Sequence, residues 1–439
     1  MRAQVPHACR HLTRAIPGFR HLIPVAALFV YLLPGKLYSQ DTKVGTDSVP
    51  ADTKGDDWNE FDLGFMTARF GLGVIHEYVA YDADDESQAQ VDSIGSELEN
   101  QFDWRDFRFV ANGQFNTRRP FIWKVAVMYD GLEDEWTFRE TGLIVGIPEW
   151  NSEVFIGRQK EGYSLNKVQN GHSTWGNERQ PSIDLIPIMS DGIRWYGYWP
   201  RTRVFWSAAA FTDVIYEDSR FASHDWQLSG RIGVRPIYTD RMGELLHLGV
   251  NMRHARPDEG VISIRSKPES SPAPFFIDTG PFPASHTNSI GGEAYYRRGP
   301  FMTGTEFNWH SFDSEEAGDP TFFGGDVMVG YILTGETRPY LSTNSVFFFV
   351  EPEKPVHRGG PGAWELLLRY SVYDTNDGQF PGGRFWKINP MVNWYLTETW
   401  RFQLVYGYGV LDRFNLEGRR ISFKRGSRWG SFDVGNAWD

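Results

Sequence analysis

No group of residues in this sequence has the spacing of a known catalytic centre. The stretch SLNK at 164–167 fits the short S-x-x-K pattern, but this pattern alone is weak evidence for a serine nucleophile. His76-Glu77 lacks the second histidine of H-E-x-x-H, and neither G-x-S-x-G nor a P-loop occurs. The acidic run EDE at 133–135 could hold a glycosidase carboxylate, yet such runs are more often solvated loop tips. We therefore expect no catalytic site and no enzyme activity.

Metal and redox chemistry are equally poorly represented. The run DTNDG at 374–378 has side chains that calcium favours, but it lacks the EF-hand spacing and the terminal glutamate, so it is interpreted as a turn. Cys9 is the single cysteine and lies near the N-terminus, which leaves no disulfide framework and no thiolate metal site. We expect no metal and no cofactor.

The more informative residues are charged side chains within stretches that alternate between polar and apolar residues. The cations on the polar faces are Arg108, Lys124, Arg231, Arg235, Arg253, Arg297, Arg369 and Lys387. The acids on the same faces are Asp106, Asp130, Glu293, Glu306 and Glu365. A basic ring in a narrow pore would lower the barrier for anions and raise it for cations. Alternatively, the arginines pair with these acids and only brace the wall, and the sequence leaves both interpretations open.

The elements that must position these residues are strands. In 121–130, alternate residues from Phe121 to Tyr129 form an apolar face, and Lys124 and Asp130 lie on the opposite face, because successive strand side chains point to opposite sides. The same alternation appears in the stretches 104–115, 228–235, 246–253, 289–298, 301–310, 364–373, 386–396 and 401–410. The pattern predicts an all-β protein.

Alternating strands occur both in soluble sandwiches and in membrane barrels. The stretches here match the ~9–11 residues that a tilted strand needs to cross a bilayer, and they exceed the ~5–6 of an average soluble strand. Aromatic residues lie near their ends, as in an interfacial girdle: Trp104, Trp136, Trp309 and Trp400. These features favour a transmembrane antiparallel β-barrel in contact with outer-membrane lipid.

The N-terminal 39 residues have the pattern of a signal peptide. Four arginines precede the apolar stretch LIPVAALFVYLL at 22–33, and no acidic residue occurs before Asp41. We expect a signal peptide at 1–39, a flexible polar leader at 40–59, the barrel at 60–429 and a short tail at 430–439. Acidic residues outnumber Lys and Arg by 56 to 44, which argues against a nucleic-acid-binding protein because phosphates require a basic surface.

Longer segments resemble a known family. The stretches VISIRSKPESSPAPFFIDTG at 261–280, GYILTGETRPY at 330–340, GAWELLLRYSVYD at 362–374 and NPMVNWYLTETWRFQLVY at 389–406 are similar to the phosphate-selective porin O and P family, in matching order. The stretches FDWRDFRFVANG at 102–113 and VFIGRQKEGYS at 154–164 resemble it more loosely. The resemblance covers about residues 60–425.

This resemblance implies a 16-stranded, usually trimeric porin of the bacterial outer membrane, with short periplasmic turns and longer outer loops. It also implies an arginine ladder and lysines that attract phosphate or polyphosphate. Four residues match the family's stretches and are carried over as anion-attracting candidates: Arg105, Arg108, Arg265 and Lys267. The chain's acidity departs from this pattern. The aromatic residue near the C-terminus is Trp438, one place before the end, and we expect the last strand at 419–429, followed by a tail. We also expect the outer-membrane assembly machinery to insert this barrel.

We therefore predict a water-filled outer-membrane channel for passive diffusion of small solutes, with a preference for anions such as phosphate. The pore-lining candidates are Arg105, Arg108, Lys124, Arg231, Arg235, Arg253, Arg265, Lys267, Arg369 and Lys387. The alternative from a different class is an exported soluble β-rich enzyme or carbohydrate-binding protein. A barrel with a plugged lumen and a structural or adhesive role is a third hypothesis.

Overall fold

The computed structural model describes residues 59–82, 98–212, 224–378, 380–414, 420–422 and 427–436, all within one compact unit, Leu37–Asp439. The expected signal peptide and residues 40–58 of the expected leader lie outside this part. Asn59, assigned to the leader, is buried, and its side-chain amide donates to the Phe70 carbonyl at 2.7 Å. No helix in the described part is both long and apolar enough to span a membrane.

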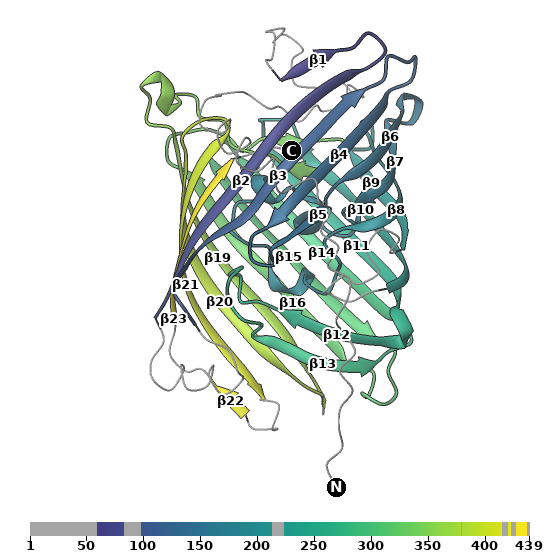
Figure 1. Ribbon diagram of the computed structural model, residues 1–439, viewed down its shortest axis with the longest axis vertical. Helices are drawn as coiled ribbons and strands as arrows, with labels where there is room; N and C mark the ends of the chain where they lie inside the picture. The colour runs from purple at the N-terminus through teal and green to yellow at the C-terminus, as the bar shows by residue number, and fades with distance from the viewer. Residues whose placement is uncertain are drawn as a thin grey trace. The chain divides into compact units, whose positions relative to one another are not determined.

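The described chain is almost entirely β-structure (Figure 1). The strands of the first half are β1 (Glu60–Asp62), β2 (Thr67–Asp82), β3 (Gln101–Gln114), β4 (Phe121–Asp130), β5 (Glu135–Phe138), β6 (Thr141–Ile147), β7 (Ser152–Gln159), β8 (Ser190–Trp199) and β9 (Val204–Thr212). Those of the second half are β10 (His224–Tyr238), β11 (Leu245–Pro257), β12 (Val261–Ser266), β13 (Ile277–Pro283), β14 (Thr287–Arg298), β15 (Phe301–Phe312), β16 (Thr321–Ile332), β17 (Tyr340–Leu341), β18 (Val346–Phe347), β19 (Ala363–Asp377), β20 (Phe380–Tyr395), β21 (Trp400–Phe414), β22 (Arg420–Ser422) and β23 (Ser427–Asn436). The helical pieces are η2 (Pro148–Trp150), α3 (Leu165–Val168), η3 (Gly171–Ser173), η4 (Pro181–Ile183), η5 (Asp258–Gly260) and η6 (Val356–Arg358).

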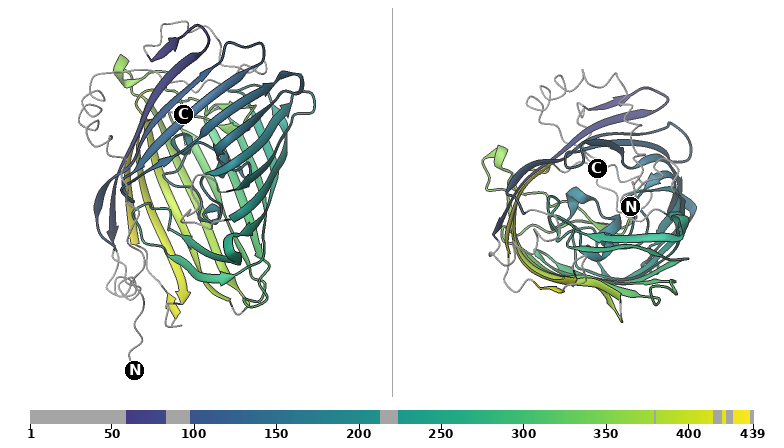
Figure 2. Two further views of the ribbon diagram at one scale, coloured as in Figure 1. Left: turned by 45° about the vertical axis from the view of Figure 1, so that its right-hand side comes forward. Right: turned by 60° about the horizontal axis from the view of Figure 1, so that its bottom comes forward.

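The main sheet is antiparallel throughout, and its neighbours follow chain order. The pairings run β2–β3–β4–β6–β7–β8–β9–β10–β11–β14–β15–β16–β19–β20–β21–β23. β23 also pairs with β2, from Ile75↔Gly435 to Asp82↔Arg428. The tilted strands curve around a common axis (Figure 2). The predicted all-β, antiparallel architecture is confirmed.

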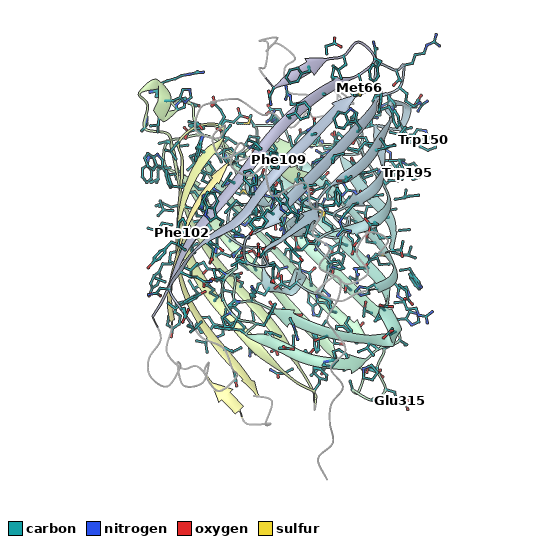
Figure 3. All side chains as sticks on the ribbon, viewed as in Figure 1. Met66, Phe102, Phe109, Trp150, Trp195 and Glu315 are labelled. Carbon is teal, nitrogen blue, oxygen red and sulfur yellow. The ribbon has the colours of Figure 1, made fainter. Side chains whose placement is uncertain are left out.

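The alternation seen in the sequence sets the two faces of this sheet. Along β11, Val250 and Met252 are exposed, whereas Asn251 and Arg253, which alternate with them, are almost fully buried. Phe102, Phe109, Trp150 and Trp195 are labelled among the side chains on the outer surface in Figure 3. The apolar faces therefore point outward and the polar faces inward, which is the arrangement of a membrane barrel rather than of a soluble sandwich.

Because neighbouring strands are antiparallel, successive connections alternate between the two ends of the sheet. One end carries short turns at 115–120, 148–151, 200–203, 239–244, 299–300 and 396–399. The opposite end carries longer connections, among them residues 160–189 and 258–286. The connection 333–362 is an exception, because it belongs to the short-turn end yet is as long as the connections opposite.

Three of these connections fold against the inner face of the sheet, and we name them the first (160–189), second (258–286) and third (333–362) inner segments. Buried apolar residues of the first and third segments pack with inward residues of β14–β21: Leu165, Trp175, Tyr295, Met302, Met328, Tyr340, Phe347, Leu367, Met391 and Val405. Four residues of the second segment belong to a separate apolar cluster: Ile262, Ile264, Phe276 and Phe282. They share it with Leu185 of the first segment and with strand residues Phe312, Phe322, Tyr373, Phe385 and Leu411.

The last strand differs from the expectation. We placed it at 419–429, with a tail from residue 430, whereas the structure has the short β22 and then β23, which extends to Asn436. β23 pairs with β21 from Trp400↔Asn436 to Gly409↔Ser427. Side-chain alternation alone does not reveal this boundary, because backbone hydrogen bonding to two neighbouring strands decides where the last strand lies.

Candidate functional site: the interior of the barrel

Arg105 and Arg108 both act at the inner face of β3, although their spacing would place them on opposite faces of a regular strand. The register of β2 with β3 shifts at this point, so that Trp104 pairs with His76 and Asp106 pairs with Ile75. The resulting bulge adds one residue and turns Arg105 inward.

Both arginines meet carboxylates inside the barrel. Arg105 lies 2.7 Å from Glu178 of the first inner segment and 3.6 Å from Glu77 of β2. Arg108 is 2.6 Å from Asp106. These pairs leave little uncompensated positive charge on β3 itself.

Arg231 belongs to a buried polar cluster centred on Glu293 of β14. Glu293 Oε1 accepts a hydrogen bond from Arg231 Nε at 2.8 Å and lies 2.9 Å from His247 Nε2. Its other oxygen accepts from the backbone N–H of Leu165 at 2.8 Å, at the start of α3. His247 Nδ1 lies 2.7 Å from the Tyr340 hydroxyl in the third inner segment. One carboxylate thus connects two inner segments that enter from opposite ends.

Arg369 and Lys387 meet the second inner segment at Glu269. Arg369 is 3.0 Å from the Glu269 carboxylate, and it also donates to the Glu178 carbonyl at 2.7 Å. Lys387 Nζ donates to the carbonyls of Pro268 at 3.0 Å and of Glu269 at 3.3 Å. Both cations are almost fully buried and hold this segment against β19 and β20.

Arg253 is paired in a similar way. Its Nε donates to Glu161 of the first inner segment at 2.9 Å, and its NH2 donates to the side chain of Gln227 on β10. The side chains of Arg253 and Glu161 have no solvent exposure. This arginine therefore fastens the first inner segment to β11.

The remaining wall candidates have other environments. Arg235 is fully buried, with its guanidinium 3.6 Å from the ring centre of Tyr198 and 4.6 Å from that of Tyr238. Such contacts are cation–π interactions. Lys124 points inward from β4 and keeps partial exposure.

Arg265 and Lys267 do not lie on the main wall. They belong to the second inner segment, where Arg265 is about half exposed and lies 3.3 Å from Asp278. Lys267 donates to the Ser271 carbonyl at 2.5 Å. Eight of the ten candidates thus lie on strands of the main sheet, and Arg265 and Lys267 lie in the second inner segment.

Sequence reasoning missed the cations of the first inner segment. Lys167 donates to the Ile186 carbonyl at 2.6 Å, and Arg179 donates to the carbonyls of Asn166 and Gln169 at 2.8 Å each. Burial lowers the pKa of Lys167 well below its usual value and that of Arg179 to about 10. Strand alternation gave no signal for these residues, because they lie outside the strands.

Arg338 of the third inner segment was also missed. It donates to both oxygens of Glu365, at 2.9 and 2.7 Å, and to the Tyr395 hydroxyl at 2.7 Å. Glu365 holds the pKa of Arg338 above its ordinary value. Arg338 also donates to the Ser173 carbonyl at 3.3 Å, which joins the third inner segment to the first.

The described residues contain no group of three or more His, Cys, Asp or Glu that could hold a metal ion. Several acids of the interior instead bond to arginines and to backbone N–H groups. Glu306, for example, accepts from the N–H of Asn166 at 3.1 Å, one residue after the N–H that Glu293 holds. Glu293 and Glu306 thus attach the start of α3 to the inner face of β14 and β15.

Comparison with known proteins agrees with this architecture. The model of the family described as phosphate-selective porin O and P matches residues 80–413. The chain is 22% identical to Porin O of Pseudomonas aeruginosa over 373 residues, which cover 73% of this chain and 83% of that protein. An uncharacterised protein of Caulobacter vibrioides is 32% identical over 184 residues, which cover 40% of this chain and only 36% of that protein.

Among solved structures, the anion-selective porin from Comamonas acidovorans superposes with a TM-score of 0.51 at 12% identity, covering 84% of this chain and 98% of that one. At this identity the likeness shows the fold. The chain therefore belongs to the phosphate-selective porin O and P family and is a β-barrel protein of the bacterial outer membrane.

Proposed function

We propose that this protein is an outer-membrane channel through which small solutes diffuse passively, with a preference for anions. The observation that carries the proposal is that several inner cations bond to backbone carbonyls and not to carboxylates. Most of the predicted wall arginines pair with carboxylates, so their charge is cancelled locally. Other cations bond only to neutral groups among the described residues, and a carbonyl partner satisfies the hydrogen bond without cancelling the charge.

Arg179 of the first inner segment has partners of this kind. Arg297 of β14 donates to the carbonyls of Arg241 at 2.9 Å and of Gly243 at 3.1 Å. Arg194 of β8 donates to the Lys160 carbonyl at 3.3 Å. These arginines therefore place positive charge inside the barrel that no carboxylate in contact cancels, which favours anion entry.

The proposal extends to the assembly. We propose a closed barrel of sixteen strands, supported by the pairing of β23 with both β21 and β2. A cleaved signal peptide follows from the basic and apolar N-terminal residues, insertion by the outer-membrane assembly machinery from the aromatic residue near the C-terminus, and a homotrimeric state from the family resemblance. The solutes are small anionic or polar molecules, with phosphate and polyphosphate as the first to test.

The test is the zero-current potential of the purified protein in a planar bilayer under a KCl gradient. The proposal predicts that chloride is more permeant than potassium and that added phosphate reduces the chloride current. Cation preference would refute the anion preference, and the absence of any channel current from correctly folded protein would refute the channel.

A further inference from the structure

Four tryptophans form a cluster on the outer surface of the barrel, beside the short turns that follow β6 and β8. The ring centre of Trp195 lies 5.5 Å from that of Trp150 and 4.8 Å from that of Trp206. Trp199 continues the cluster, with its ring centre 5.8 Å from that of Trp206. Figure 3 labels Trp150 and Trp195 on the outer surface, toward the end of the barrel that lies opposite Glu315. The four indoles therefore form one continuous group that faces away from the interior.

Arginines occupy the turns on both sides of this cluster. Arg119, in the turn 115–120, donates to both carboxylate oxygens of Glu149, at 3.2 and 3.0 Å, and Glu149 precedes Trp150 in the chain. The turn 200–203 directly follows β8. The two turns contribute four exposed arginines: Arg118, Arg119, Arg201 and Arg203. We name these arginines and the four tryptophans the Trp–Arg patch.

The patch keeps most of its positive charge. Glu149 is the one acidic residue in the three turns that adjoin the cluster, and it pairs with Arg119. Arg203 donates to a backbone carbonyl at 2.7 Å, a partner that carries no charge. Arg118 and Arg201 have no ion-pair partner among the described residues. An acidic protein thus presents a local basic surface next to exposed indoles.

The acids that could neutralise this surface lie elsewhere. Exposed acidic residues are concentrated in the runs 133–135, 258–259 and 313–319, all at the end of the barrel that carries the longer connections. All copies of a barrel insert into a membrane in the same direction, so the acidic end of a neighbouring copy lies at the other membrane surface. The anionic partner that the membrane itself offers at the short-turn end is a lipid phosphate.

The order of side chains along β8 matches the layers of a lipid leaflet. Ile193 faces outward and pairs with Ile156 of β7, and the two are 51% and 47% exposed. The indoles of Trp195 and Trp199 follow toward the short turn, and Arg201 lies beyond them. Apolar side chains contact acyl chains, indoles favour the interface, and guanidinium groups bind phosphate with two parallel hydrogen bonds.

We infer that the Trp–Arg patch binds the headgroup of an anionic phospholipid in the leaflet at the short-turn end. In the orientation that the family resemblance implies, this is the inner leaflet, which consists of phospholipid. The arginines bind the phosphate, the indoles contact the glycerol region, and the acyl chains lie along the apolar outward faces of β7 and β8. The patch is on the outer surface, so its lipid binding does not depend on what the lumen conducts.

A matched pair of double variants tests this lipid site. Arg118→Gln with Arg201→Gln removes the two unpaired charges of the patch, and Arg256→Gln with Arg384→Gln removes two exposed charges at the opposite end. Native mass spectrometry of the protein in detergent measures the affinity for dioleoylphosphatidylglycerol and for zwitterionic dioleoylphosphatidylcholine. Heat-modifiable gel mobility shows that each barrel is folded, and light scattering records the number of copies in each particle.

The unmodified protein is expected to bind phosphatidylglycerol more tightly than phosphatidylcholine. An arginine near an anionic lipid surface strengthens binding about fivefold, so the patch variant should bind phosphatidylglycerol about twenty-fivefold more weakly. The control variant should lose less than about twofold, because its charges are at the far end of the barrel and are screened by salt.

Equal affinity of the unmodified protein for the two lipids would overturn the inferred site, as would equal losses in the two variants. Displacement of the lipid by an equal concentration of inorganic phosphate would show that phosphate alone is recognised and would refute the lipid assignment. A changed number of copies in the patch variant, with unchanged lipid affinity, would assign the patch to a contact between copies of the chain instead.

Discussion

Replacement of Glu293 by glutamine tests whether one buried carboxylate holds the inner segments in place. The side chains of Glu293 and Arg231 are only 0% and 3% exposed, so solvent screens their interaction little. The variant keeps the shape of the side chain but removes its charge, and it leaves the Arg231 guanidinium buried without a counter-ion. Breaking one half of a buried ion pair costs about 3–5 kcal/mol of folding free energy. Because the amide oxygen still accepts one hydrogen bond, we expect a loss of about 3 kcal/mol.

The assay is reversible urea unfolding in detergent micelles, followed by tryptophan fluorescence, with limited proteolysis of the first and third inner segments beside it. Glu315→Gln is the control, because Glu315 is an exposed residue of the 313–320 connection. Both segments should become more sensitive to protease in Glu293→Gln, since Glu293 holds the start of α3 and, through His247, Tyr340.

A double variant separates the cause. If the cost comes from the stranded guanidinium, Arg231→Gln combined with Glu293→Gln will be more stable than the sum of the two single losses predicts. Strict additivity would refute the stranded-charge explanation. A loss in Glu293→Gln no larger than that of the control would refute the anchoring role.

Three further predictions concern other parts of the interior. Desolvation raises the pKa of Asp184 from 3.8 to about 7. An acid whose pKa is raised in the folded state adds stability that is complete below pH 3.8 and is lost as the pH rises through 7. Protease resistance of the first inner segment should therefore fall between about pH 5 and 8, and Asp184→Asn should remove this dependence. Trp175→Ala should lower the free energy of unfolding by about 3–5 kcal/mol, because it empties a buried ring site, whereas exposed Trp150→Ala, the control, should cost far less in the same urea titration. Arg265→Gln should change stability by less than about 1 kcal/mol, because its pair with Asp278 is exposed; a loss as large as that of Trp175→Ala would contradict this assignment.

The strand architecture could be predicted from the sequence because it depends on a local pattern. The stretch 121–130 coincides with β4, and the charged faces of β11 and β19 point inward as their alternation required. A period of two fixes which residues share a face, and hydrophobic residues on one face must meet lipid or a core. This local rule extended to the wall residues but not to the position of β23, which depends on its two pairing partners.

The sequence by itself determined which strand cations face the interior; the tertiary structure added the cations of the connections and decided which of all these keep an effective charge there. Arg253 and Arg369 have the same pattern signature as Lys124, yet Glu161 and Glu269, which pair with these two arginines, come from segments that are far away in the chain. No periodicity predicts such contacts, because a connection between strands has no repeating pattern and its path is set by the surfaces that it buries. The charges that govern permeation therefore depend on how three inner segments fold into the barrel, a property of packing rather than of local sequence.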